Sequence, residues 1–208
     1  PEVAKQIIDR FVKRDRVDVA TGMINSAALL ATAPMLFSNR TPYISTNAGP
    51  SQLAGKECSP WFVSTSWQND NVHEAAGHHA NQRNYKNAYL LAPDYPAGRD
   101  VLNGFKRTYK GQITTEAYVK LGMFNTSQWA LDLDNPENKR FVADFDREYK
   151  RLPSAFAAQA YDAALRIDAA VLAVKGNIGN REAFMKAIHT VKAKSVRGEY
   201  RVNVNGYP

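Results

Sequence analysis

The chain has 208 residues, 44% hydrophobic and 23% charged, and is long enough to bury the core of one large or two small domains. Its formal net charge of +7 does not predict a nucleic-acid partner, because acidic and basic residues alternate along helix-like stretches such as 144–151. A single cysteine excludes an internal disulfide, and no stretch has the ~20 apolar residues that a membrane span requires.

Helices and strands alternate over the first 46 residues. Apolar residues at helical spacing predict helices over 2–14 and 27–37, and short β-type runs predict strands over 17–20 and 42–46. This alternation, with short connections, is typical of a parallel sheet with crossover helices, so we expect an α/β fold.

The same alternation repeats further along the chain, after a junction near residues 64–67. Strands are expected over 61–66, 87–92 and 113–119, and helices over 69–83 and 99–109. We therefore expect a second α/β module to follow the first.

The pattern breaks after Gly122. The strand expected over 118–121 is separated from the segment beginning at Met123 by one glycine, whereas a crossover between parallel strands needs about ten residues or more. Either the chain forms a hairpin here, or a stretch of the natural sequence is absent. The remaining expected elements are a helix beginning near 135, helices over 154–174 and 181–191, and an alternating strand over 198–206.

No strong catalytic signature is present. The chain lacks a Gly-x-Ser-x-Gly elbow, a phosphate-binding glycine-rich loop and a dinucleotide fingerprint. His73 and His78 are poorly spaced for one metal ion on one helix face. Cys58 has no activating base beside it in sequence, which favours a partly buried structural thiol. We therefore expect no catalytic residue, no metal site and no cofactor.

Small polar residues follow three of the expected strands, at 25–26, 46–49 and 94–95. Ligands of open parallel sheets bind outside the carboxyl ends of the strands, where backbone N–H groups and hydroxyls favour carboxylates. Helix caps and turns explain any one of these loops equally well, but three loops in the same position indicate a binding cleft. Trp67 and Tyr95 lie where aromatic rings can form a wall of such a cleft.

Six stretches of the chain, taken together and in order, resemble a known family. They are TGMINSAALLATAPM (21–35), PYISTNAGPSQLAG (42–55), CSPWFVSTSWQND (58–70), YLLAPDYPAGRD (89–100), DLDNPENKRFVADFDREYKRLPS (132–154) and QAYDAALRIDAAV (159–171). The set resembles the type I periplasmic solute-binding proteins of ABC transporters, and more closely their branched-chain amino-acid (Leu/Ile/Val-binding) branch. The resemblance covers essentially the whole chain.

The resemblance implies two Rossmann-like lobes with parallel sheets, joined by a hinge, that close on a ligand. Lobe 1 would contain residues 1–64 and 124–191, and lobe 2 residues 65–122 and 192–208. Family members also carry an N-terminal strand-helix-strand segment and an internal part of the second lobe. Neither has a counterpart in this sequence, so we expect lobe 2 to be incomplete.

The resemblance also implies a binding site and a role. The family's binding positions match by motif at Asn25, Ser26, Asn47, Ala48, Gly49 and Tyr95, and less closely at Trp67 and Gln159. We expect a periplasmic, exported receptor, monomeric and without a nucleic-acid partner, that delivers a small carboxylate to an ABC-transporter membrane permease. The ligand would be an aromatic acid or a branched-chain or related amino acid. Aromatic residues near the inferred cleft favour the former.

Two alternatives stay open on the sequence. A ligand-sensing regulator can use the same two-lobe fold, and an attached DNA-binding module would distinguish it; this chain shows no such module. A hydrolase on a doubly wound sheet would need a nucleophile with a base within reach, and the sequence identifies no such pair.

Overall fold

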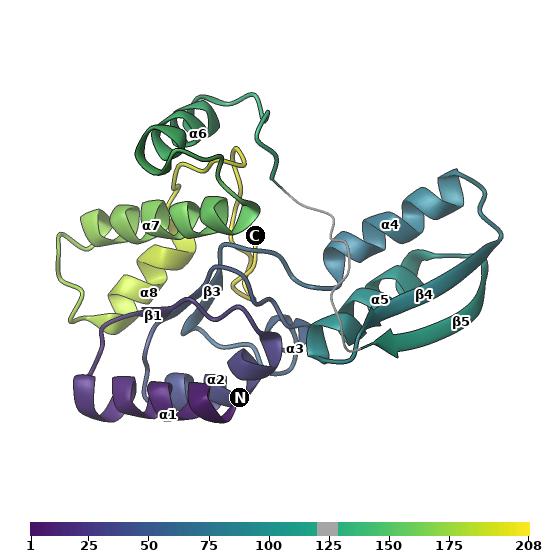
Figure 1. The fold of residues 1–208 in the computed structure, drawn as a ribbon. Coiled ribbons are helices and arrows are strands. Elements are labelled where there is room, and N and C mark those ends of the chain that lie inside the picture. Colours follow the sequence, from purple (N-terminus) through teal and green to yellow (C-terminus); the bar gives the residue numbers. More distant parts are fainter. Residues whose placement is uncertain (120–128) are drawn as a thin grey trace.

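The computed structural model describes residues 1–119 and 129–208. They form two α/β units, each built on a parallel sheet, which lie side by side in Figure 1. The larger unit contains a three-stranded sheet of order β1-β2-β3, and the smaller unit a two-stranded sheet, β4-β5. The strands are β1 (Ala20–Thr21), β2 (Tyr43–Ser45), β3 (Phe62–Ser64), β4 (Asn87–Pro93) and β5 (Gln112–Val119). The expected parallel α/β architecture is confirmed.

Helices cover both faces of the three-stranded sheet: α1 and α2 lie on one side of it, and α7 and α8 on the other (Figure 1). The helices of the larger unit are α1 (Glu2–Arg10) with its π-helical extension η1 (Phe11–Asp15), α2 (Ser26–Ser38), α3 (Ser51–Ala54), α6 (Pro136–Tyr149), α7 (Ala155–Ala173) and α8 (Arg181–Thr190). Those of the smaller unit are α4 (Asn71–Gln82) and α5 (Pro96–Thr108).

Side-chain capping starts four of these helices. The residue before each first turn accepts a hydrogen bond from a backbone N–H inside it, which satisfies one of the four donors that a helix N-terminus leaves unpaired. The capping residues are Asn25 for α2, Asn135 for α6, Ser154 for α7 and Asn180 for α8.

The short strands of the larger unit are buried on both faces because their side chains alternate between two cores. Tyr43 and Phe62 point into a cluster with residues of α1 and α2, and their rings stack with centroids 6.3 Å apart. The next residue on each strand, Ile44 and Val63, points into the opposite cluster with Phe184 and other residues of α7 and α8. Alternation at a period of two, covered on both sides, is what a parallel sheet with helices on its faces requires.

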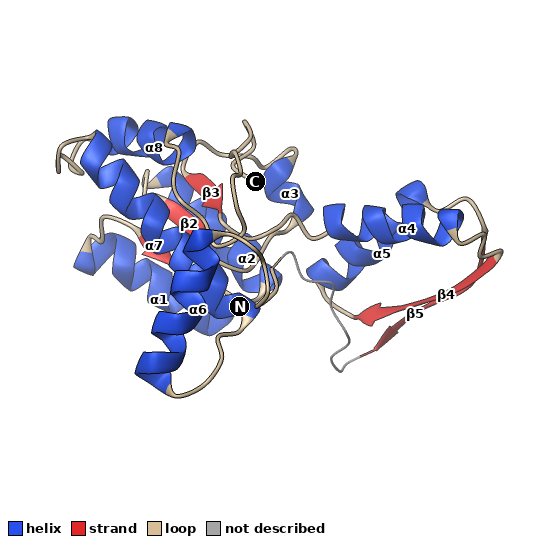
Figure 2. Ribbon diagram, turned by 90° about the horizontal axis from the view of Figure 1, so that it is seen from above, coloured by secondary structure: helices blue, strands red, loops and turns tan. Residues whose placement is uncertain are grey.

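The smaller unit has a core of its own. Leu90 and Ala92 of β4 pack with Leu102 of α5, and α4 lies alongside α5 (Figure 2). Gly77 of α4 permits this contact, since a Cβ there would overlap the side chain of Thr108. Both helices lie on the same side of the two-stranded sheet in Figure 2.

The C-terminal segment differs from its prediction. No strand forms over 198–206, and residues 192–208 pack against the larger unit rather than continuing lobe 2. Tyr207 is buried with its ring centroid 5.3 Å from that of Phe62, and the Ser64 N–H donates to the carbonyl of Gly206 at 2.6 Å. The residues do alternate, but the segment pairs with no strand in the described part of the chain, and Val204 is left 95% exposed.

Three further expectations need comment. Cys58 is exposed, not partly buried, because it lies on the loop between α3 and β3. The short helix α3 was not predicted. The end of the strand expected over 118–121 and the break at Gly122-Met123 lie outside the described residues, as does the expected lobe boundary at 124. The remaining lobe boundaries stay predictions.

Candidate ligand-binding site

Three loops meet at the carboxyl edge of the three-stranded sheet. β1, β2 and β3 are neighbours and run parallel, so the segments that follow them leave the sheet at the same edge. These segments are residues 22–25, 46–50 and 65–70, which we call the edge loops. They contain most of the predicted binding residues.

The first edge loop leads into α2. The side chain of Asn25 caps this helix by accepting the Ala28 N–H at 3.1 Å, so its carbonyl oxygen already has a structural role. Ser26, 2% exposed, accepts a hydrogen bond from the Asn69 amide at 3.2 Å, and its own hydroxyl proton remains available to donate. The N–H groups of the first turn of α2 have no acceptor within the helix. This end of α2 can therefore attract an anion.

The second edge loop supplies donors that no described residue uses. The carbonyl of Asn47 accepts from the Ser66 hydroxyl at 2.8 Å, and Ala48 donates its N–H to Met23 at 3.4 Å. In contrast, the side-chain amide and N–H of Asn47 and the N–H of Gly49 have no hydrogen-bond partner within residues 1–119 and 129–208. The loop is held by its carbonyls and by the N–H of Ala48, and it leaves the N–H groups of Asn47 and Gly49 for another molecule.

The third edge loop passes directly over the second one. The Asn69 N–H donates to the Gly49 carbonyl at 2.8 Å, and a Cβ on Gly49 would overlap the carbonyl oxygen of Trp67. Only glycine allows the two backbones to approach so closely. Trp67 is half-buried beside this contact. Ser26, Asn47, Ala48, Gly49 and Trp67 are therefore brought together as the sequence predicted.

Tyr95 lies in the smaller unit, at the start of α5 and after the end of β4. Partial burial raises the pKa of its hydroxyl above the usual value. Among the described residues, no hydrogen bond or ring contact joins its side chain to the edge loops. Its role in closing over a ligand stays a prediction.

Gln159 lies on α7, next to the third edge loop. Its backbone carbonyl accepts from the Thr65 hydroxyl at 3.2 Å. The residue is 1% exposed, and both the oxygen and the nitrogen of its side-chain amide lack a hydrogen-bond partner. A buried amide without partners is rare in folded proteins and costs free energy, and a polar molecule bonded to it would remove this cost.

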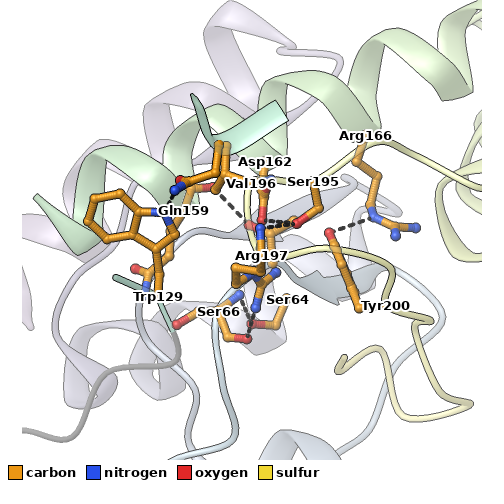
Figure 3. Close-up of polar contacts among 12 residues, drawn as sticks. Ser64, Ser66, Trp129, Gln159, Asp162, Arg166, Ser195, Val196, Arg197 and Tyr200 are labelled. Atoms are coloured by element: carbon orange, nitrogen blue, oxygen red, sulfur yellow. Dashed lines mark hydrogen bonds and ion pairs between the residues drawn. The ribbon is translucent and has the colours of Figure 1, made fainter. Parts of the chain in front are cut away.

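The sequence analysis missed Arg197, which approaches the same loop from the C-terminal segment (Figure 3). Its Nε donates to the buried carboxylate of Asp162 at 2.8 Å, and its Nη1 to the Ser66 carbonyl at 3.4 Å. The ring of Tyr200 lies against the guanidinium group, 4.4 Å from ring centroid to Cζ. Since the arginine follows no strand and lies on no periodic face, no pattern in the sequence marks it.

Asn69 and Asp100 were also missed, and they join the two units. The carboxylate of Asp100, on α5, accepts the N–H and hydroxyl of Ser51 at 3.0 and 2.6 Å. The Asn69 amide bridges Ser26 and Asp100 at 3.2 Å each. The first edge loop, α3 and α5 are thereby linked through one buried network.

Two surface hollows lie away from the edge loops. One, of about 390 Å³, lies between α7 and α8, and the other, of about 860 Å³, is lined by the start of α6 and residues 189–202. Among the described residues, no three His, Cys, Asp or Glu side chains are grouped as metal ligands. None of the helices within the described part of the chain is long and apolar enough to cross a membrane.

Comparison with known proteins identifies the family. The sequence model of a family described as periplasmic binding protein matches residues 1–123 and 113–206, two matches that overlap where the sequence pattern breaks. No curated protein matches the chain.

Several solved structures share the fold. A solute-binding protein of an R. palustris ABC transporter, in complex with benzoate, is 21% identical with a TM-score of 0.92, over 99% of this chain and 76% of that one. An ABC transporter substrate-binding protein from Sphaerobacter thermophilus is 20% identical, with a TM-score of 0.89 over 100% and 77%. A branched-chain amino-acid transporter substrate-binding protein from Streptococcus pneumoniae, in complex with isoleucine, is 15% identical, with a TM-score of 0.82 over 98% and 77%.

Proposed function

The chain belongs to the periplasmic binding protein family, and from this premise we propose that it is the solute receptor of an ABC uptake transporter. In this role it binds a small carboxylate reversibly at the edge loops and performs no chemistry on it. Closure of the two units around the ligand carries the signal, through a higher affinity of the ligand for the closed state. The receptor works outside the cytoplasm, where its partner is the membrane permease.

One observation carries the proposal: the edge loops present hydrogen-bond donors, and their one carboxylate, Asp70, is already bonded to Arg107. In the second edge loop, Asn47 and Gly49 have N–H groups without a partner. The first edge loop adds the hydroxyl of Ser26 and the N-terminus of α2. Such donors bind a carboxylate through several modest hydrogen bonds, which allows release. This set is suited to binding and not to catalysis.

An aromatic acid is the ligand that we favour. Similar structures were solved with benzoate, 3,4-dihydroxybenzoic acid and 4-hydroxybenzoate, and another with isoleucine. An amino acid also needs a carboxylate for its ammonium group. Asp70 and Asp100, the carboxylates nearest the edge loops, are buried and already bonded, Asp70 to Arg107 and Asp100 to Ser51. Trp67 and Tyr95 supply aromatic surface for a ring.

The hydrolase alternative has little support from the geometry. Within residues 1–119 and 129–208, the one hydrogen bond of a histidine side chain joins His73 Nδ1 to the backbone carbonyl of Asn69 at 3.0 Å. No hydrogen bond within these ranges joins a histidine to a serine or to Cys58, which is the pairing that an activated nucleophile needs.

Calorimetric titration tests the proposal directly. The purified chain is titrated with benzoate, 4-hydroxybenzoate, leucine and isoleucine, with benzamide as the uncharged control for benzoate. We expect saturable binding of at least one acid and recovery of the acid unchanged by mass spectrometry. Absence of binding to every acid in the panel would contradict the ligand class, and conversion of a bound acid would contradict the receptor role.

A further inference from the structure

Beside the third edge loop, two side chains have buried polar atoms without a hydrogen-bond partner: the amide of Gln159 and the Nη2 of Arg197. Gln159 lies by Thr65, whose hydroxyl donates to its backbone carbonyl at 3.2 Å, and Arg197 lies by the carbonyl of Ser66 at 3.4 Å. Thr65 and Ser66 are consecutive residues, so the backbone of Gln159 and the side chain of Arg197 both contact the same short piece of the third edge loop. This piece is itself part of the candidate site, because the Ser66 hydroxyl donates to Asn47.

Two of the three guanidinium nitrogens of Arg197 have hydrogen-bond partners, and the third has none. Its side chain is 10% exposed, its Nε is bound to Asp162 and its Nη1 to Ser66. Asp162 is satisfied too, since it also accepts the Ser195 hydroxyl at 2.8 Å and the Val196 N–H at 2.9 Å. The remaining nitrogen, Nη2, is buried and has no hydrogen-bond partner. Its two N–H groups have no acceptor in the described part of the chain.

Gln159 also has buried polar atoms without a hydrogen-bond partner. The residue lies on α7 and is 1% exposed, yet neither its amide nitrogen nor its amide oxygen has a hydrogen-bond partner among the described residues. An amide in this state loses its hydrogen bonds to water and gains none, which destabilises the fold. Two such groups beside one loop are explained together if one small polar molecule bonds to both.

We propose that Arg197 Nη2 and the Gln159 amide together receive the carboxylate of the ligand; this inference rests on the proposed receptor function. A carboxylate has two oxygens, and each accepts more than one hydrogen bond, so it can satisfy both donors at once. Bonds between a guanidinium group and a carboxylate are stronger than neutral ones, and more so where water is excluded. Arg197 is then the one charged donor of a site whose edge loops supply only neutral donors.

Gln159→Met separates this role from a structural one. Methionine keeps the length of the side chain and removes only an amide that makes no bond in the described chain. We expect the melting temperature to stay the same or rise, while benzoate affinity falls about 10- to 100-fold. A lower melting temperature with unchanged affinity would overturn the proposal.

Arg197 is tested with a protein variant and a ligand variant together. Arg197→Met alone leaves Asp162 buried and unpaired, which can unfold the chain. The double variant Asp162→Asn with Arg197→Met removes both charges and is the form to compare. Arg201→Met, at an exposed position on the same segment, is the matched control. Each protein is titrated with benzoate and with benzamide, which differ in the charge of the group proposed to meet Arg197.

The ratio of the benzoate affinity to the benzamide affinity shows whether Arg197 binds the carboxylate or only supports the loop. If Arg197 binds the carboxylate, the double variant loses about 10- to 100-fold in affinity for benzoate and little for benzamide, so the ratio falls by that factor. The Arg201 variant keeps the wild-type ratio. An equal loss for both ligands would mean that Arg197 only holds the loop, or that an internal water occupies the place, and would overturn the inference while leaving the receptor function intact. Absence of acid binding to the wild-type chain would overturn both.

Discussion

Asp100 holds the two units together, and its replacement by alanine is expected to destabilise the protein strongly. The residue is 4% exposed, and its carboxylate accepts three hydrogen bonds: from the N–H and hydroxyl of Ser51 and from the amide of Asn69. Each hydrogen bond to a charged group contributes about 1.5–3 kcal/mol, although such contributions do not add fully. Removal of the carboxylate leaves these three neutral donors without an acceptor, and each buried donor left in this way costs about 1–3 kcal/mol, so we expect the free energy of unfolding to fall by about 3–5 kcal/mol in total.

Urea unfolding followed by tryptophan fluorescence measures this loss. Asp94→Ala is the control, because Asp94 precedes the same helix but forms an exposed ion pair with Arg99 that contributes about 0–1 kcal/mol. Asp100→Asn keeps one acceptor oxygen and should lie between the two. If Asp100→Ala lowers the free energy of unfolding no more than Asp94→Ala does, the network does not join the units and the reasoning is refuted.

Three further predictions concern the site and its support. Gly49→Ala should cost about 1–3 kcal/mol or more and abolish ligand binding, because the new Cβ meets a backbone carbonyl of the third edge loop; Gly55→Ala, whose Cβ has ordinary contacts, should be tolerated in thermal melts. Burial raises the pKa of Tyr43 from 10 to about 12, so the stability that depends on its protonated form is complete below pH 10 and is lost as the pH rises toward about 12. The loss, roughly 3 kcal/mol, should be reduced in Tyr43→Phe when unfolding is measured against pH. Asn47→Ala and Tyr95→Ala should each weaken acid binding about 2- to 10-fold in calorimetry without lowering the melting temperature, since neither side chain makes a hydrogen bond in the described residues.

The elements of the fold were predictable because local patterns decide them. Apolar spacing and capping residues such as Asn25 and Ser154 mark the helices, and the runs around Ile44 and Val63 mark strands buried on both faces. The strand expected over 198–206 failed for the opposite reason. Its alternation is real, but the segment has no neighbouring strand with which to pair in the described structure, and its ends are fixed by contacts distant in sequence.

The candidate site likewise contains residues that the sequence predicts and residues that it does not. Strand ends are recognisable in the sequence, and parallel strands place their loops at one edge, so Ser26, Asn47 and Gly49 could be named together. Arg197, by contrast, reaches the loop from more than a hundred residues away, through a bond to Ser66 that depends on the packing of the C-terminal segment. Contacts of this kind depend on tertiary structure and leave no local signal.

The bonding of Arg197 bears on how such a receptor can release its ligand. A free guanidinium group binds a carboxylate through two parallel hydrogen bonds, a strong arrangement that slows dissociation. Here Asp162 occupies Nε and the Ser66 carbonyl occupies Nη1, so only Nη2 is left for a ligand, and the positive charge is already balanced. On the inference above, the ligand therefore meets a single charge-assisted contact together with neutral donors from Asn47 and Gly49. We therefore expect the acid to dissociate faster than it would from a two-point ion pair, because differences in affinity between related sites lie mostly in the dissociation rate.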